Sequence, residues 1–413
     1  MKVVLFIDNH SMDKVDISEL SKGNPGIGGT QYEMFLLAYL MFIRNKDIDF
    51  HLVLTHKQNG FDFPNIHVID RFDDVFSFCE VNKVDVAIMR ENNRYNLIKG
   101  LTKTKVIFWV HNFISYPVVR QIGLEDNIKR VIFVSKQHYD FYIEYNLNKK
   151  ANYIFNTLAF PQSLPKQVEK QNNVVFTGNI VPIKRLHLVT KIWPYIHKKV
   201  PDSKLLVIGT GANAHRDVEL GPHKLATAEY ESKIFKPLEK HNLIDTVEFL
   251  GIKGIDKNEI IQTAKVGVSP NKDETFCLSA AEYIINGVPV VGVSRGGIND
   301  VVLHKQTGLL HRSLGSIKKD IVRILKGKKN IVISQESIKA MESKFSYDCF
   351  YDAWIQNIQE VYEGVKVKRL RPSKPYWDKA KWVGCVFRFL RRYFKLPERF
   401  TRLGVYSLIR RSK

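Results

Sequence analysis

The sequence has few cysteines and no long apolar run. Its four cysteines, Cys79, Cys277, Cys349 and Cys385, are scattered over 413 residues, and their spacing fits neither a metal site nor a disulfide framework. No stretch approaches the roughly 18–20 apolar residues of a membrane-spanning helix. The apolar start, MKVVLFIDNH, is too short for the core of a signal peptide and lacks a cleavage site. These absences predict a cytoplasmic protein.

Acidic residues are scarce beside basic ones. The chain has 42 Asp and Glu against 63 Lys and Arg, a net charge of +21. Residues 366–413 contain 16 basic and 2 acidic residues, a net charge of +14, so residues 1–365 carry only +7. Such a basic tail predicts an anionic partner, either a membrane or a nucleic acid. No cluster of carboxylates stands at the end of an expected strand, so no metal ligand is predicted.

Short apolar segments alternate with helical ones in two series, which predicts an α/β fold. The first series of expected parallel strands is VVLFI, HLVLT, VDVAIM, KVIFWV and RVIFVS, and the second is VVFTGN, KLLVIGTG, VEFLG, VGVSP and PVVGVS. A polar connector with prolines, near residues 156–172, separates them. The pattern predicts two Rossmann-like domains that face a cleft, at residues 1–160 and 161–345. Helical periodicity predicts a terminal helix at 346–364, followed by the basic tail at 365–413.

Two glutamates eight residues apart mark the most informative block. AKVGVSP predicts a buried strand and LSAAEYII the helix after it, which puts Glu274 on the loop between them and Glu282 within the helix. The carboxyl edge of an open α/β sheet is where ligands bind. We expect the amides of Thr275, Phe276, Cys277 and Leu278 at the helix N-terminus, where anions bind. Carboxylates that accept from hydroxyls, beside amides that donate to phosphate, favour a nucleoside-diphosphate sugar as ligand.

This block resembles the donor site of the retaining GT-B-fold glycosyltransferases of group 1, or family 4. There Glu-x7-Glu precedes an apolar strand and a Gly-Gly pair, here Gly296-Gly297. The resemblance implies that Glu274 contacts the donor sugar and Glu282 the ribose hydroxyls. It also implies that the 346–364 helix crosses back onto the first domain. Cys277 replaces the glycine that usually follows the phenylalanine, a departure that affects the amide geometry.

Four further segments are similar to site segments of that family. The Gly-rich loop NPGIGGTQYE places Gly28 and Gly29 at a helix start, and the resemblance implies that they lie under the donor diphosphate and near the acceptor. Lys184 matches the family lysine that holds the diphosphate, whereas Asn179 stands at the position of the family arginine, and Arg185 is a candidate second cation. His111 ends the strand KVIFWV, where the family commonly has a histidine near the transferred sugar.

The resemblance implies a metal-independent, retaining glycosyltransferase without a cofactor, with a UDP- or GDP-type sugar as donor. Glu274, Lys184 and His111 are the candidate catalytic residues, and Gly28, Gly29, Arg185, residues 275–278 and Glu282 the candidate binding residues. The acceptor is expected to be a glycan, lipid-linked, in bacterial surface polysaccharide or lipopolysaccharide synthesis. The alternatives are a GT-B sugar-nucleotide epimerase, an inverting transferase, a non-catalytic GT-B-like binding protein and a nucleic-acid-binding protein.

Residues 377–395 predict a basic amphipathic helix. On a helical projection with Arg388 at the origin, the basic residues occupy one arc and the aromatic and aliphatic residues the opposite arc. This segregation favours a helix that lies in a membrane interface, whereas single-stranded nucleic acid is bound by aromatic residues interleaved with basic ones. We therefore expect a peripheral enzyme on the inner face of the cell membrane, with no nucleic-acid partner. The alternative is a helix packed on this protein or on a second subunit.

Overall fold

The chain divides into two α/β units. The computed structural model describes residues 1–10, 12, 14–142, 145–161, 168–211, 219–368, 370, 371, 373, 386, 387, 389, 390, 393 and 394. The first unit consists of Met1–Thr157 and the chain from Phe345 on, and the second of Leu158–Lys344. The boundary predicted between residues 160 and 161 falls in the same connector. The predicted α/β class, with two parallel sheets and their helices, is confirmed.

The first unit is built on a seven-stranded parallel sheet in the order β3-β2-β1-β4-β5-β6-β7. Its central strands are continuous β-branched and aromatic runs, buried on both faces as in other sheets covered by helices. The strands are β1 (Lys2–Ile7), β2 (Asp49–Leu54), β3 (Ile66–Val68), β4 (Val86–Arg90), β5 (Lys105–Val110), β6 (Ile128–Phe133) and β7 (Ala151–Tyr153).

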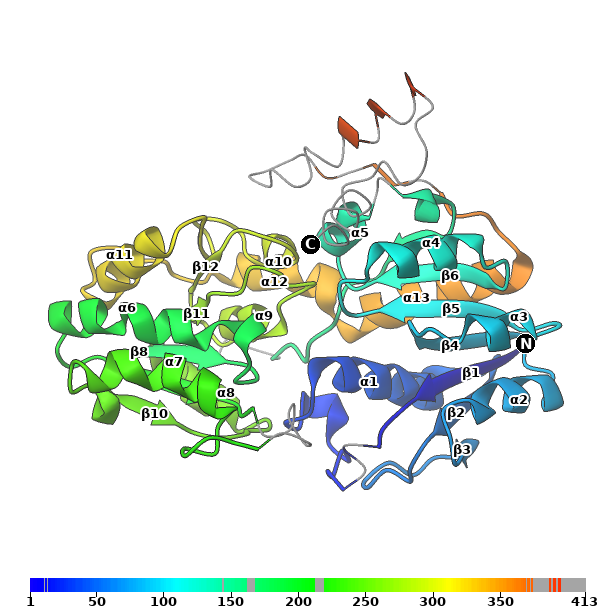
Figure 1. The fold of residues 1–413 in the computed structure, drawn as a ribbon, viewed down its shortest axis with the longest axis horizontal. Coiled ribbons are helices and arrows are strands. Elements are labelled where there is room, and N and C mark those ends of the chain that lie inside the picture. The colour runs from blue at the N-terminus through cyan, green and yellow to red at the C-terminus, as the bar shows by residue number, and fades with distance from the viewer. Residues whose placement is uncertain are drawn as a thin grey trace. The chain divides into compact units, whose positions relative to one another are not determined.

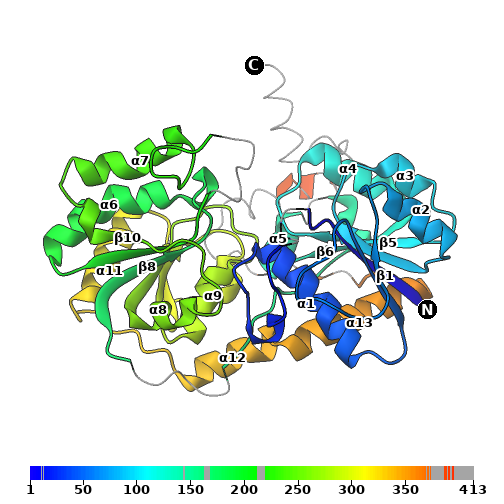
Figure 2. The ribbon, with the colours of Figure 1, turned by 90° about the horizontal axis from the view of Figure 1, so that it is seen from below.

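Helices from both ends of the chain cover the first sheet (Figure 1). The long α1 follows the Gly-rich loop and lies beside α13 (Figure 2). The helices are α1 (Gly29–Arg44), α2 (Asp74–Val81), α3 (Tyr95–Lys99), α4 (Tyr116–Leu124), α5 (Lys136–Phe141) and α13 (Tyr347–Glu363).

The terminal helix α13 packs on the first sheet. Ser346 caps its start by accepting a hydrogen bond from the backbone of Cys349, and Gly364 ends it in the left-handed conformation, with φ of 78°. Trp354 is fully buried against Trp109 of β5, with ring centroids 4.6 Å apart. The buried Arg130 of β6 donates to Glu360 at 2.8 Å. Aromatic packing and a partly buried ion pair thus attach the helix to the sheet.

The second unit has a six-stranded parallel sheet in the order β10-β9-β8-β11-β12-β13. The strands are β8 (Gln171–Thr177), β9 (Lys204–Ile208), β10 (Val247–Phe249), β11 (Ala264–Ser269), β12 (Val290–Val293) and β13 (Gly308–His311). The helices are α6 (Leu186–Lys199), α7 (Ala228–Glu239), α8 (Lys257–Thr263), α9 (Leu278–Ile285), α10 (Ile298–Val301), α11 (Leu314–Leu325) and α12 (Gln335–Phe345).

Each sheet has a point where the strand order reverses. In the first sheet β1 lies between β2 and β4, and in the second β8 lies between β9 and β11. In open α/β sheets, ligands bind outside the carboxyl ends of the strands at such a switch point. A ligand site is therefore expected in the first unit at the residues that follow β1 and β4, and in the second unit at those that follow β8 and β11.

The predicted amphipathic helix at 377–395 lies mostly outside the described residues. Within the part of the chain that the structure describes, no helix is long and apolar enough to cross a membrane. Phe389, Tyr393 and Phe394 are described and exposed, at 55%, 67% and 65%.

Candidate functional site

Lys184 and Glu274 meet at the switch point of the second sheet. Lys184 ends a short 3-10 turn, Pro182–Lys184, after β8, and Glu274 lies on the loop between β11 and α9. The Lys184 ammonium donates to Glu274 Oε1 at 2.7 Å. Glu274 is 8% exposed, whereas the Lys184 side chain is 35% exposed. A buried carboxylate and a more exposed cation therefore stand together at the carboxyl edge of the sheet.

The charge of Glu274 keeps Lys184 protonated. Burial lowers the pKa of the Lys184 ammonium, but the Glu274 carboxylate and its hydrogen bond outweigh burial, so the pKa rises above its ordinary value. Asn271, at the end of the same strand–loop segment, also donates to Glu274 Oε1. Asn271 was not predicted from the sequence, because an asparagine three positions before a glutamate has no signature of its own.

The Gly-Gly pair lets two loops come into backbone contact. Gly296 has a φ of 73°. The backbone N–H of the next residue, Gly297, donates to the carbonyl of Glu274 at 2.7 Å. A Cβ at Gly296 would lie 2.2 Å from the Glu274 carbonyl oxygen, and one at Gly297 would lie 2.2 Å from that of Thr275. Any side chain at either position would displace the loop that carries Glu274.

The helix α9 begins one residue after Cys277, which occupies its N-cap. Cys277 has φ of 88°, a left-handed conformation that glycine adopts without strain and other residues rarely adopt. Thr275 and Phe276 precede this cap, and Leu278 is the first helical residue. Of the four predicted amides, those of Cys277 and Leu278 are therefore at the helix start, while those of Thr275 and Phe276 belong to the loop before it.

Glu282 lies on α9 and forms an ion pair that the sequence did not indicate. Its Oε1 is 2.7 Å from the ammonium of Lys257 on α8, and the two side chains are 13% and 8% exposed. Arg185, directly after Lys184, is the left-handed N-cap of α6, with φ of 58°. Arg185 is half-buried and is not part of the Lys184–Glu274 pair.

The remaining predicted residues, Gly28, Gly29 and His111, belong to the first unit. Gly28 is the N-cap of α1 and Gly29 its first residue. Asn24 orders the Gly-rich loop, because its Oδ1 accepts from the backbones of Gly26 and Ile27 at 2.9 Å each. No side chain caps α1 and no acidic residue occupies its first turn, so its positive end is available to an anion.

His111 follows β5 and is buried, at 5% exposure, and its Nε2 has no hydrogen-bond partner among the described residues. Burial, together with the charge of Arg90, holds the pKa of this imidazole well below its ordinary value. His111 is therefore a neutral ring in this state, packed on Trp109 at a centroid distance of 4.7 Å.

A cavity of about 230 Å³ lies at the switch point of the first sheet. Its lining comes from the ends of β1 and β4, the first turns of α1 and the segment before α2: Phe6, Ile7, Asp8, Thr30, Gln31, Met34, Phe72, Arg90 and Glu91. Neither Arg90 nor Glu91 belongs to a motif that could be recognised in the sequence. A second cavity, of about 600 Å³, is lined by Ile17, Ser18, Tyr39 and residues 57–63 and contains none of the predicted site residues.

Glu91 is half-buried, and its Oε2 is buried without a hydrogen-bond partner among the described residues. Burial raises its pKa from 4.5 to about 7, although the charge of Arg90 and hydrogen bonds from the backbones of Glu91 and His111 lower it. Glu91 in turn contributes to the raised pKa of Tyr95. The folded protein therefore holds the Glu91 proton more tightly than the unfolded chain, and ionising Glu91 destabilises the fold.

Replacing Glu91 by glutamine should stabilise the protein at high pH and not at low pH. Below pH 4.5 the Glu91 carboxyl is protonated in both the folded and the unfolded protein. Between pH 4.5 and about 7 it loses its proton in the unfolded chain first, so the stability of the wild type falls. Above that range the variant should be more stable by roughly 3 kcal/mol. Thermal melts from pH 4 to 9 measure this. Glu80→Gln is the control, because Thr102 lowers the pKa of that exposed carboxyl; an equal gain in both variants would contradict the assignment.

Among the residues that the structure describes, no group of three or more His, Cys, Asp or Glu side chains could hold a metal ion.

The second unit matches a known protein family. Residues 161–339 match the family model of the glycosyl transferases group 1. The chain is 25% identical over 199 residues to GDP-Man:Man(3)GlcNAc(2)-PP-Dol alpha-1,2-mannosyltransferase of Dictyostelium discoideum, a match that covers 46% of this chain and 37% of that protein. It is 25% identical over 180 residues to lipopolysaccharide 1,2-N-acetylglucosaminetransferase of Salmonella typhimurium, covering 42% and 45%. The aligned parts thus span less than half of either relative.

A solved structure extends the likeness to the whole fold. The crystal structure of HepE from Anabaena in complex with UDP and glucose superposes with a TM-score of 0.65 and 13% identity, covering 87% of this chain and all of that one. At this identity the likeness establishes the fold.

Proposed function

Since residues 161–339 match the glycosyl transferases group 1 and the fold is of the GT-B type, we propose that the chain is a glycosyltransferase. It transfers a sugar from a nucleoside-diphosphate sugar to a glycan acceptor with retention of configuration. The observation that carries this proposal is the ion pair of Lys184 and Glu274 beside the N-terminus of α9. A cation and a helix start suit a diphosphate, and a carboxylate suits sugar hydroxyls. The HepE structure with UDP and glucose supports a donor of this class.

In the proposed reaction Lys184 stabilises the charge that builds up on the leaving diphosphate. Its raised pKa keeps it cationic, and preorganised cations and amides lower the barrier to departure of an anion. Glu274 orients the donor sugar by accepting hydroxyl hydrogen bonds, and Glu282 accepts those of the ribose. The acceptor hydroxyl attacks from the face that the diphosphate leaves, and the leaving phosphate takes its proton. The cationic and amide groups would supply the stabilisation for which other transferases use a metal.

The direct test is a screen of the purified chain against a panel of UDP- and GDP-sugars for released nucleotide. We expect release from one donor class, faster when the right glycan acceptor is added, and a product of the same anomeric configuration. Inverted product would refute retention, and an epimerised donor without transfer would support a sugar-nucleotide epimerase. No turnover of any nucleotide sugar would contradict the proposal.

We further propose that the acceptor is lipid-linked and that the tail holds the enzyme on the inner face of the cell membrane, in surface polysaccharide or lipopolysaccharide synthesis. The names of the two relatives, one acting on a dolichol-linked glycan and one on lipopolysaccharide, support this class of acceptor. The +14 charge of residues 366–413 and the exposed Phe389, Tyr393 and Phe394 support membrane binding.

Truncation after Ser373 should abolish binding to anionic vesicles while donor hydrolysis stays near wild type. The truncation point keeps Ser373, which donates to Asp140. Each basic residue near an anionic surface contributes about 1 kcal/mol to binding. Salt should weaken the binding of the wild type only in part, because salt screens charges and does not weaken the insertion of aromatic side chains into the membrane. Vesicle sedimentation measures the effect. If the truncated chain still sediments, or fails to fold, the tail is a structural element.

A further inference from the structure

The cavity of the first unit combines charge and position in a way that the donor site does not use. It lies outside the carboxyl ends of β1 and β4, where the strand order reverses. Its volume, about 230 Å³, is below the roughly 300–1,000 Å³ of pockets for drug-sized ligands. A cavity of this size suits one sugar ring or one phosphate group.

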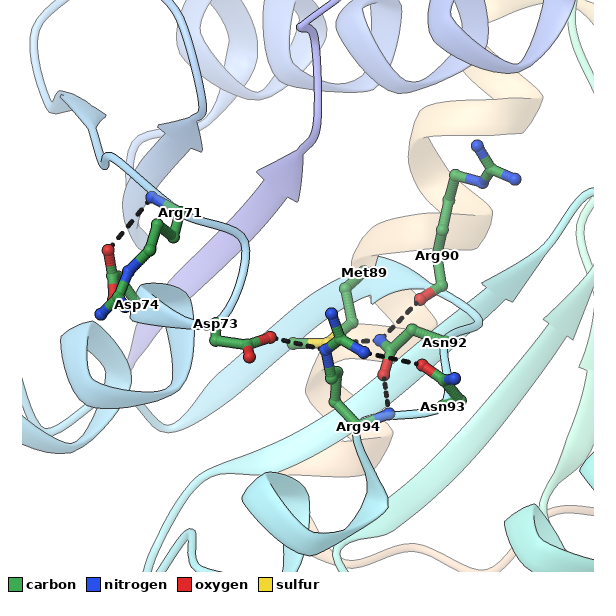
Figure 3. A network of polar contacts seen from close by, with 8 residues as sticks. All are labelled: Arg71, Asp73, Asp74, Met89, Arg90, Asn92, Asn93 and Arg94. Carbon is green, nitrogen blue, oxygen red and sulfur yellow. Dashed lines mark hydrogen bonds and ion pairs between the residues drawn. The ribbon is translucent and has the colours of Figure 1, made fainter.

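Arg90 differs from the arginines around it in lacking a counter-ion in the part of the chain that the structure describes. Within the described ranges no carboxylate forms an ion pair with it, and its Nε is buried without a hydrogen-bond partner. By contrast, Arg71 pairs with Asp74 at 3.0 Å and Arg94 with Asp73 at 2.6 Å. Figure 3 shows those two pairs, and shows the Arg90 guanidinium extending away from them while its carbonyl accepts from Asn92.

The groups around Arg90 neutralise its charge only in part. Glu91 is next in the chain, but burial makes its carboxyl hard to ionise. His111 is buried and neutral. Asp8 lines the cavity but is exposed, and its Oδ1 accepts from Thr55 and from the backbone of His10. The first turn of α1, with Thr30 and Gln31 at the cavity, adds partial positive charge.

We propose that this cavity binds an anionic group, phosphate or carboxylate, on the acceptor substrate, and that Arg90 pairs with it. Arg90 is half-buried, and burying its Nε without a hydrogen-bond partner among the described residues is costly. The planar fork of N–H donors on a guanidinium matches both phosphate and carboxylate. Glu91 then forms a hydrogen bond with a neighbouring hydroxyl of the acceptor, as acceptor when ionised and as donor when protonated. The assignment to the acceptor rests on the proposed function, in which Lys184 and α9 of the second unit already serve the donor diphosphate.

Binding to the full chain, without turnover, tests the proposal. Glucose 6-phosphate and glucuronate are the anionic probes, glucose is the neutral probe, and UDP is the donor probe, each measured by isothermal titration. We expect the wild type to bind an anionic probe at least tenfold more tightly than glucose, as charge-assisted hydrogen bonds imply. Arg90→Met should lose about tenfold or more of that affinity and leave UDP binding unchanged.

Arg71→Met is the matched control, because Arg71 lies on the neighbouring segment, 81% exposed and already paired; it should bind all probes as wild type does. Arg90→Lys, which keeps the charge, should retain part of the affinity and serves if Arg90→Met fails to fold. Unchanged binding of anionic probes by the Arg90 variants, or equal binding of glucose and the anionic sugars, would overturn the proposal. A loss of UDP affinity in Arg90→Met would instead assign the cavity to the donor. Arg90-dependent binding without turnover of any nucleotide sugar would refute the proposed function alone.

Discussion

Replacing Lys184 by alanine should reduce kcat by about 30-fold to 1,000-fold, the equivalent of 2–4 kcal/mol in activation free energy. The side chain is the cation of the Lys184–Glu274 pair, and no other group among the described residues forms an ion pair with Glu274. Its loss removes the charge that stabilises the departing diphosphate. Donor hydrolysis and transfer, measured at saturating donor, report the effect.

The control for this variant is Lys204→Ala. Lys204 pairs with Glu248 at 2.7 Å in the same unit, but both side chains are well exposed, so this change should leave turnover within about twofold, since exposed pairs contribute little. A loss of less than tenfold in Lys184→Ala would move the role to Arg185. It would also make the asparagine at position 179 a more serious departure from the family pattern.

Glu274→Gln and Glu282→Gln should fail in different ways. Glu274 is proposed to touch the sugar, whose charge changes in the transition state, so its amide variant should lower kcat by about 100-fold with a small change in KM. Glu282 is proposed to hold the ribose, whose charge does not change, so its variant should raise the donor KM about tenfold. Steady-state kinetics with the donor found in the screen separates the two effects.

Both glutamates are in ion pairs, so each variant needs a structural control. Lys257→Met removes the partner of Glu282 without touching the carboxylate. If Glu282 binds ribose, Lys257→Met should change the donor KM less than Glu282→Gln does. The assignment fails if the two glutamate variants lose kcat and KM in the same proportion, if either is fully active, or if Lys257→Met reproduces Glu282→Gln.

The alternation of apolar and helical segments was enough to predict two parallel sheets. Runs such as KVIFWV can only be buried on both faces, which is what a central parallel strand requires. The short strands β3, β7 and β13 were not predicted, because none has more than two consecutive strongly apolar residues and each becomes a strand by pairing with a neighbour. The equally short β10 and β12 were predicted because they lie in the longer apolar segments VEFLG and PVVGVS. Cys277 was recognised as a departure from the family glycine. Its φ of 88° lies in the left-handed region that glycine adopts without strain, which explains why glycine is usual at this position.

Some residues of the candidate site were predicted from the sequence, and others were found only in the structure. Strand, loop and helix signals placed Glu274 and Glu282 at a sheet edge, and the family resemblance singled out Lys184. The sequence could not supply their partners Asn271 and Lys257, because these contacts depend on how helices and loops pack.

By itself the sequence determined the α/β class, the order of the elements and the segments that carry charge to the carboxyl edges of the sheets, since these follow from local periodicity and from backbone freedom at glycine. Only the tertiary structure decided which charges are neutralised. Arg71 and Arg94 look no different from Arg90 in the sequence, yet they have carboxylate partners, whereas Arg90 has none among the residues that the structure describes. Burial and pairing arise from residues far apart in the chain, so the cavity beside Arg90 and Glu91 became visible only once β1 and β4 lay side by side.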